Sequence, residues 1–338
     1  MPPIDAGATD YEGAAMKLLL IIVLSVAAIY AGVWVVASRG LNHGLQAGIA
    51  AAEAQGWQID SGSLTTGGFP SRFDVHATDL TVTAPDGNLI WQAPWLETAA
   101  LSYRPNKVIA VFPPQQTLRV DGQTLTLASD GLRASLAVAA TRLLDFSTMT
   151  AEAQSLSLAS DLGWSVTGGA AVLGLRAHGP AANTFEAYLK MADVQPSLAL
   201  PSAPTAPAQV TADATFTLDR PLDRLALLPA RPGITALTLD TLTVDWGGLV
   251  LSANGDLSVD PAGIPTGTIT VVATGWRDRI GLLAEAGLVP AGMLQTLTSM
   301  AGMLTGAGGA LTLPLTFANG NMALGPVPLG PAPRIALP

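Results

Sequence analysis

The 338-residue sequence contains no cysteine, which excludes disulfides, thiolate catalysis, cysteine-ligated metals and lipidation at a cysteine. It has only three histidines, His43, His76 and His178, and their spacing forms none of the usual metal-binding motifs. It also lacks a GxSxG nucleophile elbow and a GxxxxGK[ST] phosphate-binding loop. We therefore expect no enzyme activity, no metal site and no cofactor.

Charge is scarce as well. Charged residues make up 12% of the chain, about half of the usual share in a soluble domain, and only Lys17, Lys107 and Lys190 are lysines. The net charge is −9 and no basic stripe is present, which argues against a nucleic-acid partner. Hydrophobic residues reach 49%, with a mean hydropathy of +0.41. This excess predicts either an apolar groove or membrane-facing side, or only a drift in composition toward Ala, Leu, Thr, Gly and Pro.

The longest apolar run is Leu18–Ser38, which carries no charge and lies between Lys17 and Arg39. At about 1.5 Å per residue, a helix over this run spans a hydrocarbon core of about 30 Å. Tyr30 and Trp34 lie toward its end, where aromatic rings favour the membrane interface. We interpret residues 18–38 as a transmembrane anchor that contacts the lipid bilayer.

The alternative is a cleaved signal peptide. The run exceeds the usual apolar region of about 7–15 residues, and no clear small-x-small cleavage site follows it. We therefore expect residues 1–17 to be a short tail that stays inside the cell, with the long remainder exported. The predicted location is the inner (cytoplasmic) membrane, with a single pass and the bulk of the chain in the periplasm.

After the anchor, residues 39–56 predict a membrane-proximal helix. Leu41, Leu45 and Ile49 recur at helical spacing, and Gly56 ends the pattern. From Trp57 onward the period changes to two.

The rest of the chain alternates apolar with polar residues, in runs about 8–12 residues apart, as antiparallel strands do. The alternation is clearest over residues 237–246, where a phase slip at Asp240-Thr241 predicts a bulge. Asn254-Gly255 between two such runs predicts a hairpin turn. The fold class is therefore mainly β, an antiparallel sheet that is either curled or sandwiched, with a few helices and one N-terminal transmembrane helix.

Two segments predict helices within this β-rich chain. Asn183 and Glu186 have the spacing of a capping box that leads into a short helix, and residues 276–306 predict a helical insertion with two helices around Pro290. The proline-rich segment 196–208 is either a linker between two domains or a loop within one sheet. The remaining parts are β-rich region 1 (57–195), β-rich region 2 (209–325) and a proline-rich tail (326–338) that we expect to lie over the edge of the sheet or to wrap its end.

One motif, GGFPSRF at residues 67–73, combines residues that make a sharp corner. The two glycines permit positive φ, and the proline forces an extended conformation on the residue before it. We expect Phe73 to begin a strand facing inward and Arg72 to face outward, toward a carboxylate or a lipid phosphate. A structural corner is the simpler interpretation and a binding role is the alternative. The candidate residues are Gly68, Phe69, Pro70, Arg72 and Phe73.

A second motif concentrates aromatic residues, which are only 5% of the chain. It predicts either an aromatic contact with acyl chains or a partner, or a core plug at the membrane-proximal end of the sheet. The candidate residues are Trp91, Pro94, Trp95, Tyr103 and Pro105.

The order of these features resembles the DUF2125 family of uncharacterised bacterial envelope proteins. The resemblance rests on the anchor, GGFPSRF at 67–73, Asp79-Leu80, WQAPWL at 91–96, Tyr103-Arg104-Pro105, GDLSVDPAGIPTGTITV at 255–271 and LPLTFANGNMALGPVPLG at 313–330. The arrangement is also distantly similar to AsmA-like envelope proteins, whose curled sheets present an apolar groove. That resemblance implies lipid handling in envelope homeostasis.

We therefore expect an envelope protein whose apolar groove binds a lipid ligand. The alternative function is a structural or assembly scaffold for an envelope protein partner, bound through sheet edges or the proline-rich tail.

Overall fold

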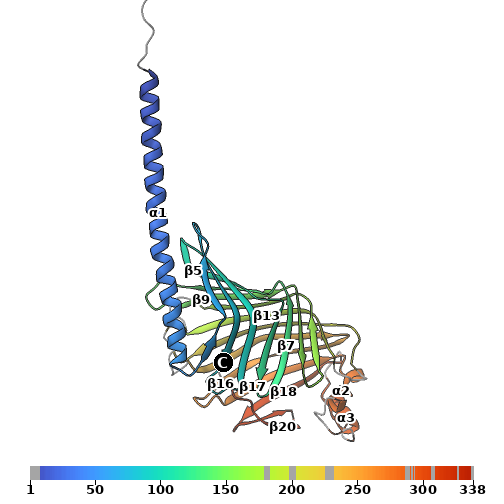
Figure 1. The fold of residues 1–338 in the computed structure, drawn as a ribbon. Coiled ribbons are helices and arrows are strands. Elements are labelled where there is room, and N and C mark those ends of the chain that lie inside the picture. The colour runs from blue at the N-terminus through green and yellow to red at the C-terminus, as the bar shows by residue number, and fades with distance from the viewer. Residues whose placement is uncertain are drawn as a thin grey trace, which may run out of the picture.

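A computed structural model describes residues 8–178, 183–197, 203–224, 232–285, 290, 292, 294–305, 309–325 and 327–335. It has a single long helix, α1 (Ala8–Glu53), which projects from one side of a large β-sheet (Figure 1). The predicted anchor and membrane-proximal helix are therefore one continuous helix, which begins within the predicted tail. By length and composition, the stretch from Leu20 is apolar enough to cross a membrane. Gly56, at φ +90°, follows its end.

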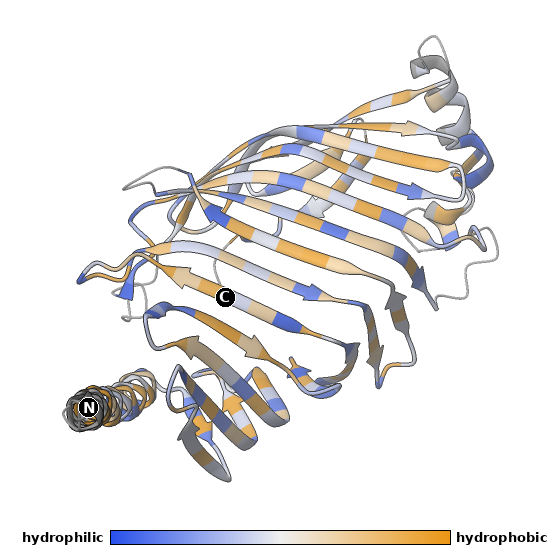
Figure 2. Ribbon diagram, turned by 90° about the horizontal axis from the view of Figure 1, so that it is seen from above, coloured by the Kyte–Doolittle hydropathy of each residue, from blue (hydrophilic) through white to orange (hydrophobic). Residues whose placement is uncertain are grey.

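All the strands of the described chain belong to one antiparallel sheet, which confirms the predicted fold class and resolves it in favour of a curled sheet (Figure 2). The strands are β1 (Gln58–Asp60), β2 (Ser63–Gly67), β3 (Arg72–Thr83), β4 (Leu89–Leu101), β5 (Arg104–Val111), β6 (Gln115–Val120), β7 (Gln123–Asp130), β8 (Arg133–Val138), β9 (Phe146–Ala153), β10 (Ser155–Ser160), β11 (Ser165–Gly168), β12 (Ala171–Ala177), β13 (Thr184–Pro196), β14 (Ala208–Leu218), β15 (Ile234–Trp246), β16 (Leu249–Val259), β17 (Pro265–Thr274), β18 (Leu311–Ala318), β19 (Asn321–Leu324) and β20 (Val327–Pro331).

The sheet divides into two branches between β4 and β13. One half of β4 pairs with β5 and the other with β6. The β5 branch continues through β8, β9 and β12, and the β6 branch through β7, β10 and β11, until both branches pair with β13. From β13 to β20, consecutive strands pair as a simple meander. Because β13 pairs with β14, the sheet runs on across the proline-rich segment 196–208.

The predicted helix after Asn183 is wrong, because these residues form β13. Phe185, Ala187 and Leu189 also alternate with polar residues, and β13 finds a hydrogen-bonding partner strand on each side. Tertiary pairing therefore overrides the local capping signal. The predicted turn at Asn254-Gly255 is wrong as well, since both residues lie inside β16.

Other local predictions are confirmed. The register between β15 and β16 shifts between Leu239 and Leu242, which places a bulge at the predicted Asp240-Thr241. Pro290 lies between the short helix α2 (Leu282–Glu285) and α3 (Leu294–Leu304), which follow the 3-10 turn η2 (Arg277–Arg279). These helices lie at the end of the sheet far from α1 (Figure 1). The proline-rich tail, which we expected to lie over the edge of the sheet or to wrap its end, instead adds a strand to it, because β20 pairs with β19 at the end of the meander. Residues 326 and 336–338 lie outside the described chain.

Candidate functional site

Apolar residues line up across the sheet on one face, the inner face. The register joins one row of residues through thirteen strands from β3 to β19, and each residue of this row is apolar or glycine. The row is Phe73, Ala100, Val108, Leu136, Met149, Leu175, Ala187, Ala214, Leu239, Gly255, Ile269, Leu315 and Leu324. Side chains that are neighbours across paired strands share a face of the sheet. The row therefore forms a continuous apolar band.

The neighbouring row, one residue away along each strand, lies on the opposite, outer face and is polar through eight strands, β9 and β12 to β18, before it reaches Ala137 in β8 and Ala323 in β19. Its polar residues are Thr148, Arg176, Glu186, Thr215, Thr238, Asp256, Thr268 and Thr316. A sheet that faces water on both sides would not need this separation. Along these strands the inner face is therefore the more apolar of the two.

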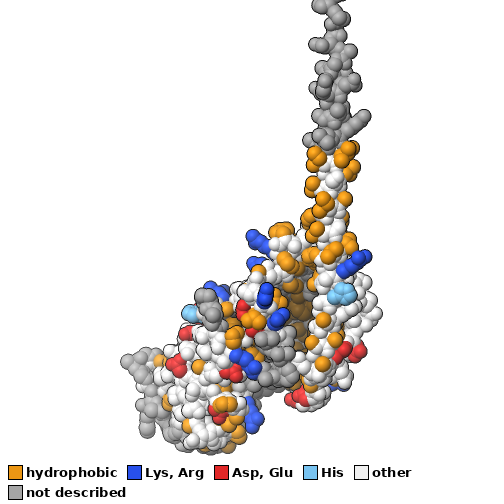
Figure 3. Space-filling model, turned by 90° about the vertical axis from the view of Figure 1, so that its left-hand side faces the viewer, with side chains coloured by type: hydrophobic (Ala, Val, Ile, Leu, Met, Phe, Trp, Pro, Cys, Tyr) orange, Lys and Arg blue, Asp and Glu red, His pale blue; other side chains and the backbone are white. Residues whose placement is uncertain are grey.

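The inner face is packed near the strand ends and open in the middle. Phe185, Leu257 and Phe317 are buried there, whereas Leu136, Leu173 and Leu189 are 42%, 41% and 36% exposed. Figure 3 shows hydrophobic side chains inside a hollow between the sheet and α1. Three leucines of the inner face are thus left accessible by the chain's own side chains.

Helix α1 packs against the first strands at the side of this hollow. Trp34 stacks on Phe73 with ring centroids 5.8 Å apart and meets Phe69 edge-on at 5.3 Å. Further along, Asn42 Oδ1 accepts a hydrogen bond from the hydroxyl of Thr66 in β2. The half-buried positions of α1 include Leu41, the first residue of the predicted stripe. Helix and sheet are therefore joined by side chains of the predicted GGFPSRF motif.

The GGFPSRF corner joins β2 to β3. Gly68 has φ +98°, and an added Cβ would lie 2.8 Å from the Arg72 carbonyl oxygen, so the corner requires glycine. The Phe69-Pro70 peptide bond is cis. Phe73 points inward and is buried, as predicted, while Phe69 is 55% exposed. The exposed Arg72 guanidinium lies 3.1 Å from the Asp74 carboxylate.

The aromatic motif does not form one cluster. Trp91 lies near the start of β4, where its indole N–H donates to Gln116 Oε1 at 3.0 Å and its ring meets Phe112 edge-on. Trp95 is half-buried beside Thr78 of β3. Tyr103 follows the other end of β4 and is 70% exposed.

Tyr103 instead joins the GGFPSRF corner. The backbone N–H of Ser102 donates to the Ser71 carbonyl, which ties the β4–β5 turn to the corner. Pro105 continues this turn as an exposed residue of β5. Sequence distance separated these two motifs, and only strand pairing brings them together.

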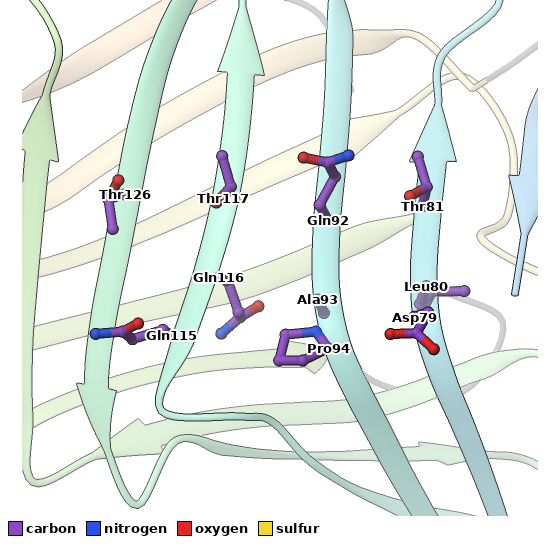
Figure 4. Close-up of a pocket in the computed structure, with 10 residues that line it drawn as sticks. All are labelled: Asp79, Leu80, Thr81, Gln92, Ala93, Pro94, Gln115, Gln116, Thr117 and Thr126. Atoms are coloured by element: carbon purple, nitrogen blue, oxygen red, sulfur yellow. The ribbon is translucent and has the colours of Figure 1, made fainter. Parts of the chain in front are cut away.

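A second pocket, open to solvent, lies where β4 leaves β6. Its volume is about 410 Å³ and threonine and glutamine side chains of four strands dominate its lining (Figure 4). Pro94 stands at this fork, where it has no N–H to offer either branch. Gln116 is 5% exposed, and its Nε2 has no hydrogen-bond partner within the described chain. Sequence reasoning missed Gln116 because its burial depends on the fork.

Residues 34–333 match the family described as "Uncharacterized protein conserved in bacteria (DUF2125)". The chain belongs to this family. The comparisons matched neither a curated protein nor a solved structure. The resemblance to AsmA-like proteins therefore stays a prediction.

Several charged groups of this DUF2125 chain form ion pairs on the outer face. Arg176 and His178 both contact the Glu186 carboxylate. The hydrogen bond from Arg176, followed by that from His178, holds the pKa of Glu186 below its ordinary value of 4.5. Arg133 pairs with Glu152 in the same way at 2.6 Å. Among the described residues, no three His, Asp or Glu side chains are grouped as a metal site requires.

Proposed function

We propose that this DUF2125 protein binds lipid acyl chains in the hollow of its curled sheet while α1 anchors it in the inner membrane. The observation that carries the proposal is the thirteen-strand apolar row on the inner face, beside a row on the outer face that is polar through eight of those strands. Covering water-exposed leucines with an apolar ligand is favourable by about 25 cal/mol for each Å² of apolar surface removed from water. Acyl chains suit this hollow because it is long, apolar and without a charged residue in its aligned row.

The proposed topology is a single pass through Leu18–Ser38 with the sheet in the periplasm. The support is the apolar stretch of α1, whose side chains from Leu20 to Tyr30 are exposed, as contact with lipid requires. We also propose a binding role rather than a catalytic one, because the sequence contains none of the nucleophile, phosphate-binding or metal-binding motifs sought above.

The test is photo-crosslinking in living cells. A benzophenone side chain is placed at Leu136 or Leu189 of the inner face, and at the adjacent Ser135 or Lys190 of the outer face as matched controls. We expect adducts of phospholipid mass from Leu136 and Leu189 and none from the two controls.

Two other results would count against lipid binding. Adducts with one dominant protein from the inner positions would support the scaffold function instead. Equal yields of lipid adduct from both faces would show contact with the bilayer at large and would refute a binding hollow.

A further inference from the structure

Along the axis of α1, the predicted membrane-spanning stretch overlaps with the part of the helix that the sheet contacts. The apolar stretch begins at Leu18, and the sheet first shields α1 at Ala31, next to Tyr30. The stretch from Leu18 to Ile29, whose described side chains from Leu20 onward are exposed, is about 18 Å long at 1.5 Å per residue. A hydrocarbon core is about 30 Å thick, so about 12 Å of the span must come from elsewhere. The nine residues Tyr30–Ser38 supply that length, and the corner of the sheet lies beside them.

From this overlap we propose that the corner of the sheet is itself embedded in the membrane. The embedded corner consists of the β2–β3 turn (68–71) and the β4–β5 turn (102–103), and its partner is the lipid leaflet on the exported side. The inference rests on the proposed anchor. It adds that the hollow beside α1 opens into the leaflet rather than into water.

Four backbone carbonyls at the corner and the start of β3 have hydrogen-bond donors. The Tyr30 hydroxyl donates to the Pro70 carbonyl at 2.8 Å, and the Trp34 indole N–H donates to the Arg72 carbonyl at 2.9 Å. The carbonyls of Gly68 and Ser71 accept from backbone N–H groups, each at 2.9 Å. Pro70 carries no N–H at all. Within a bilayer such satisfaction of polar backbone groups is required, since an unsatisfied group costs several kcal/mol.

Side chains of the corner also fit a lipid leaflet. Phe69 and Tyr103 are 55% and 70% exposed, and Leu101 at the end of β4 is 38% exposed. Figure 3 shows hydrophobic side chains at the top of the sheet next to the helix, with Lys and Arg side chains near the same level. Exposed Arg104 and Lys107 follow Tyr103 along β5. Aromatic residues at the tip would contact the acyl chains, and the basic residues behind them would lie at the level of the anionic lipid phosphates.

The rival arrangement shifts α1 along its axis, so that the corner stays in water. That shift would draw Lys17 and Glu12 toward the hydrocarbon core, where charges are costly. It would also leave Phe69 and Tyr103 exposed to water.

The experiment measures the depth of single labels in full-length protein in lipid vesicles. Because the chain has no cysteine, one cysteine at a time carries a nitrobenzoxadiazole fluorophore, at Phe69, Tyr103, Ile29 or Leu162. Ile29 reports on the free part of the anchor, and Leu162, which is 73% exposed in the turn between β10 and β11, reports on a position in water. Quenching by spin-labelled phospholipid is compared with quenching by aqueous iodide.

We expect lipid quenching at Phe69 and Tyr103 at least threefold above that at Leu162, and iodide quenching at least threefold below it. Labels at Phe69 and Tyr103 that iodide quenches as strongly as Leu162 would overturn the embedded corner. If Ile29 is shielded from iodide in that case, the anchor stands and only this inference fails. If Ile29 is also open to iodide, the proposed anchor fails with it. Tyr103 repeats the measurement without disturbing the ring contact between Phe69 and Trp34.

Discussion

Replacing Trp34 by alanine should loosen the corner from α1 without unfolding the sheet. The substitution removes two aromatic contacts, with Phe73 and with Phe69, each worth about 0.5–1.5 kcal/mol. It also removes the 2.9 Å hydrogen bond to the Arg72 carbonyl, worth about 1 kcal/mol. The sum is about 3 kcal/mol, which equals about a 100-fold change in the equilibrium between the docked and open corner.

Hydrogen exchange with mass spectrometry on the full-length protein in lipid nanodiscs measures this opening directly. Peptides over 68–73 and 100–104 should exchange about 100-fold faster in Trp34→Ala, because the opened corner frees the amides of Arg72 and Ser102. Peptides of β17 should not change.

Two further variants separate the contributions. Trp34→Phe keeps an aromatic ring and loses only the hydrogen bond, so exchange at the corner should rise about fivefold, as a loss of about 1 kcal/mol implies. Trp164→Ala makes the same large-to-small change in the turn between β10 and β11 and should leave the corner unchanged. Exchange at the corner within twofold of the wild type in Trp34→Ala would refute the reasoning that α1 holds it.

Three other changes test the sheet. Gly255→Ala should destabilise the chain by about 1–3 kcal/mol in thermal unfolding, because its Cβ would lie 2.3 Å from a backbone oxygen of β17, whereas Gly174→Ala, with 3.8 Å to its nearest neighbour, should be tolerated. Phe185→Ala should cost about 3–5 kcal/mol by the same measurement, since this ring is 1% exposed and contacts two other phenylalanines; a cost below 1 kcal/mol would contradict its place in the core. Glu186→Gln should lower the melting temperature at neutral pH and have progressively less effect below pH 4.5. A carboxylate with a lowered folded pKa stabilises fully above its unfolded pKa and loses that contribution as the pH falls through the folded value, so a difference that stays constant down to pH 3 would contradict the ion pair.

The local predictions that held depend on short-range physics. A charge-free run of 21 residues predicts a long apolar helix, and the helical stripe that follows it continues without a break. The alternation of apolar and polar residues slips by one position at Asp240-Thr241. Because side chains alternate between faces with a period of two, an extra residue is needed there to keep the apolar residues on one face, and the structure has a bulge at this point. Gly68 and Pro70 mark a corner because glycine adopts the positive φ that other residues avoid, and proline fixes its own φ.

The two wrong predictions have a shared cause. Both the capping box at Asn183 and the Asn-Gly pair at 254–255 are local signals, and both lie in strands that have partners on either side. Hydrogen bonds to two neighbouring strands outweigh the preference of a few residues. At Gly255 the close approach of β17 requires the glycine, which explains its presence inside a strand rather than at a turn.

By itself the sequence determined the long apolar helix, the antiparallel β class and the corner, because composition and period are properties of neighbouring residues. Only the tertiary structure decided what the motifs do together. The pairing of β3 with β4 brings Tyr103 to the GGFPSRF corner and leaves Trp91 at the far end of β4, and the register of thirteen strands aligns scattered leucines, alanines and valines into one apolar band. The physical reason is that strand order and register are set by contacts between residues far apart in the chain, which no local pattern encodes.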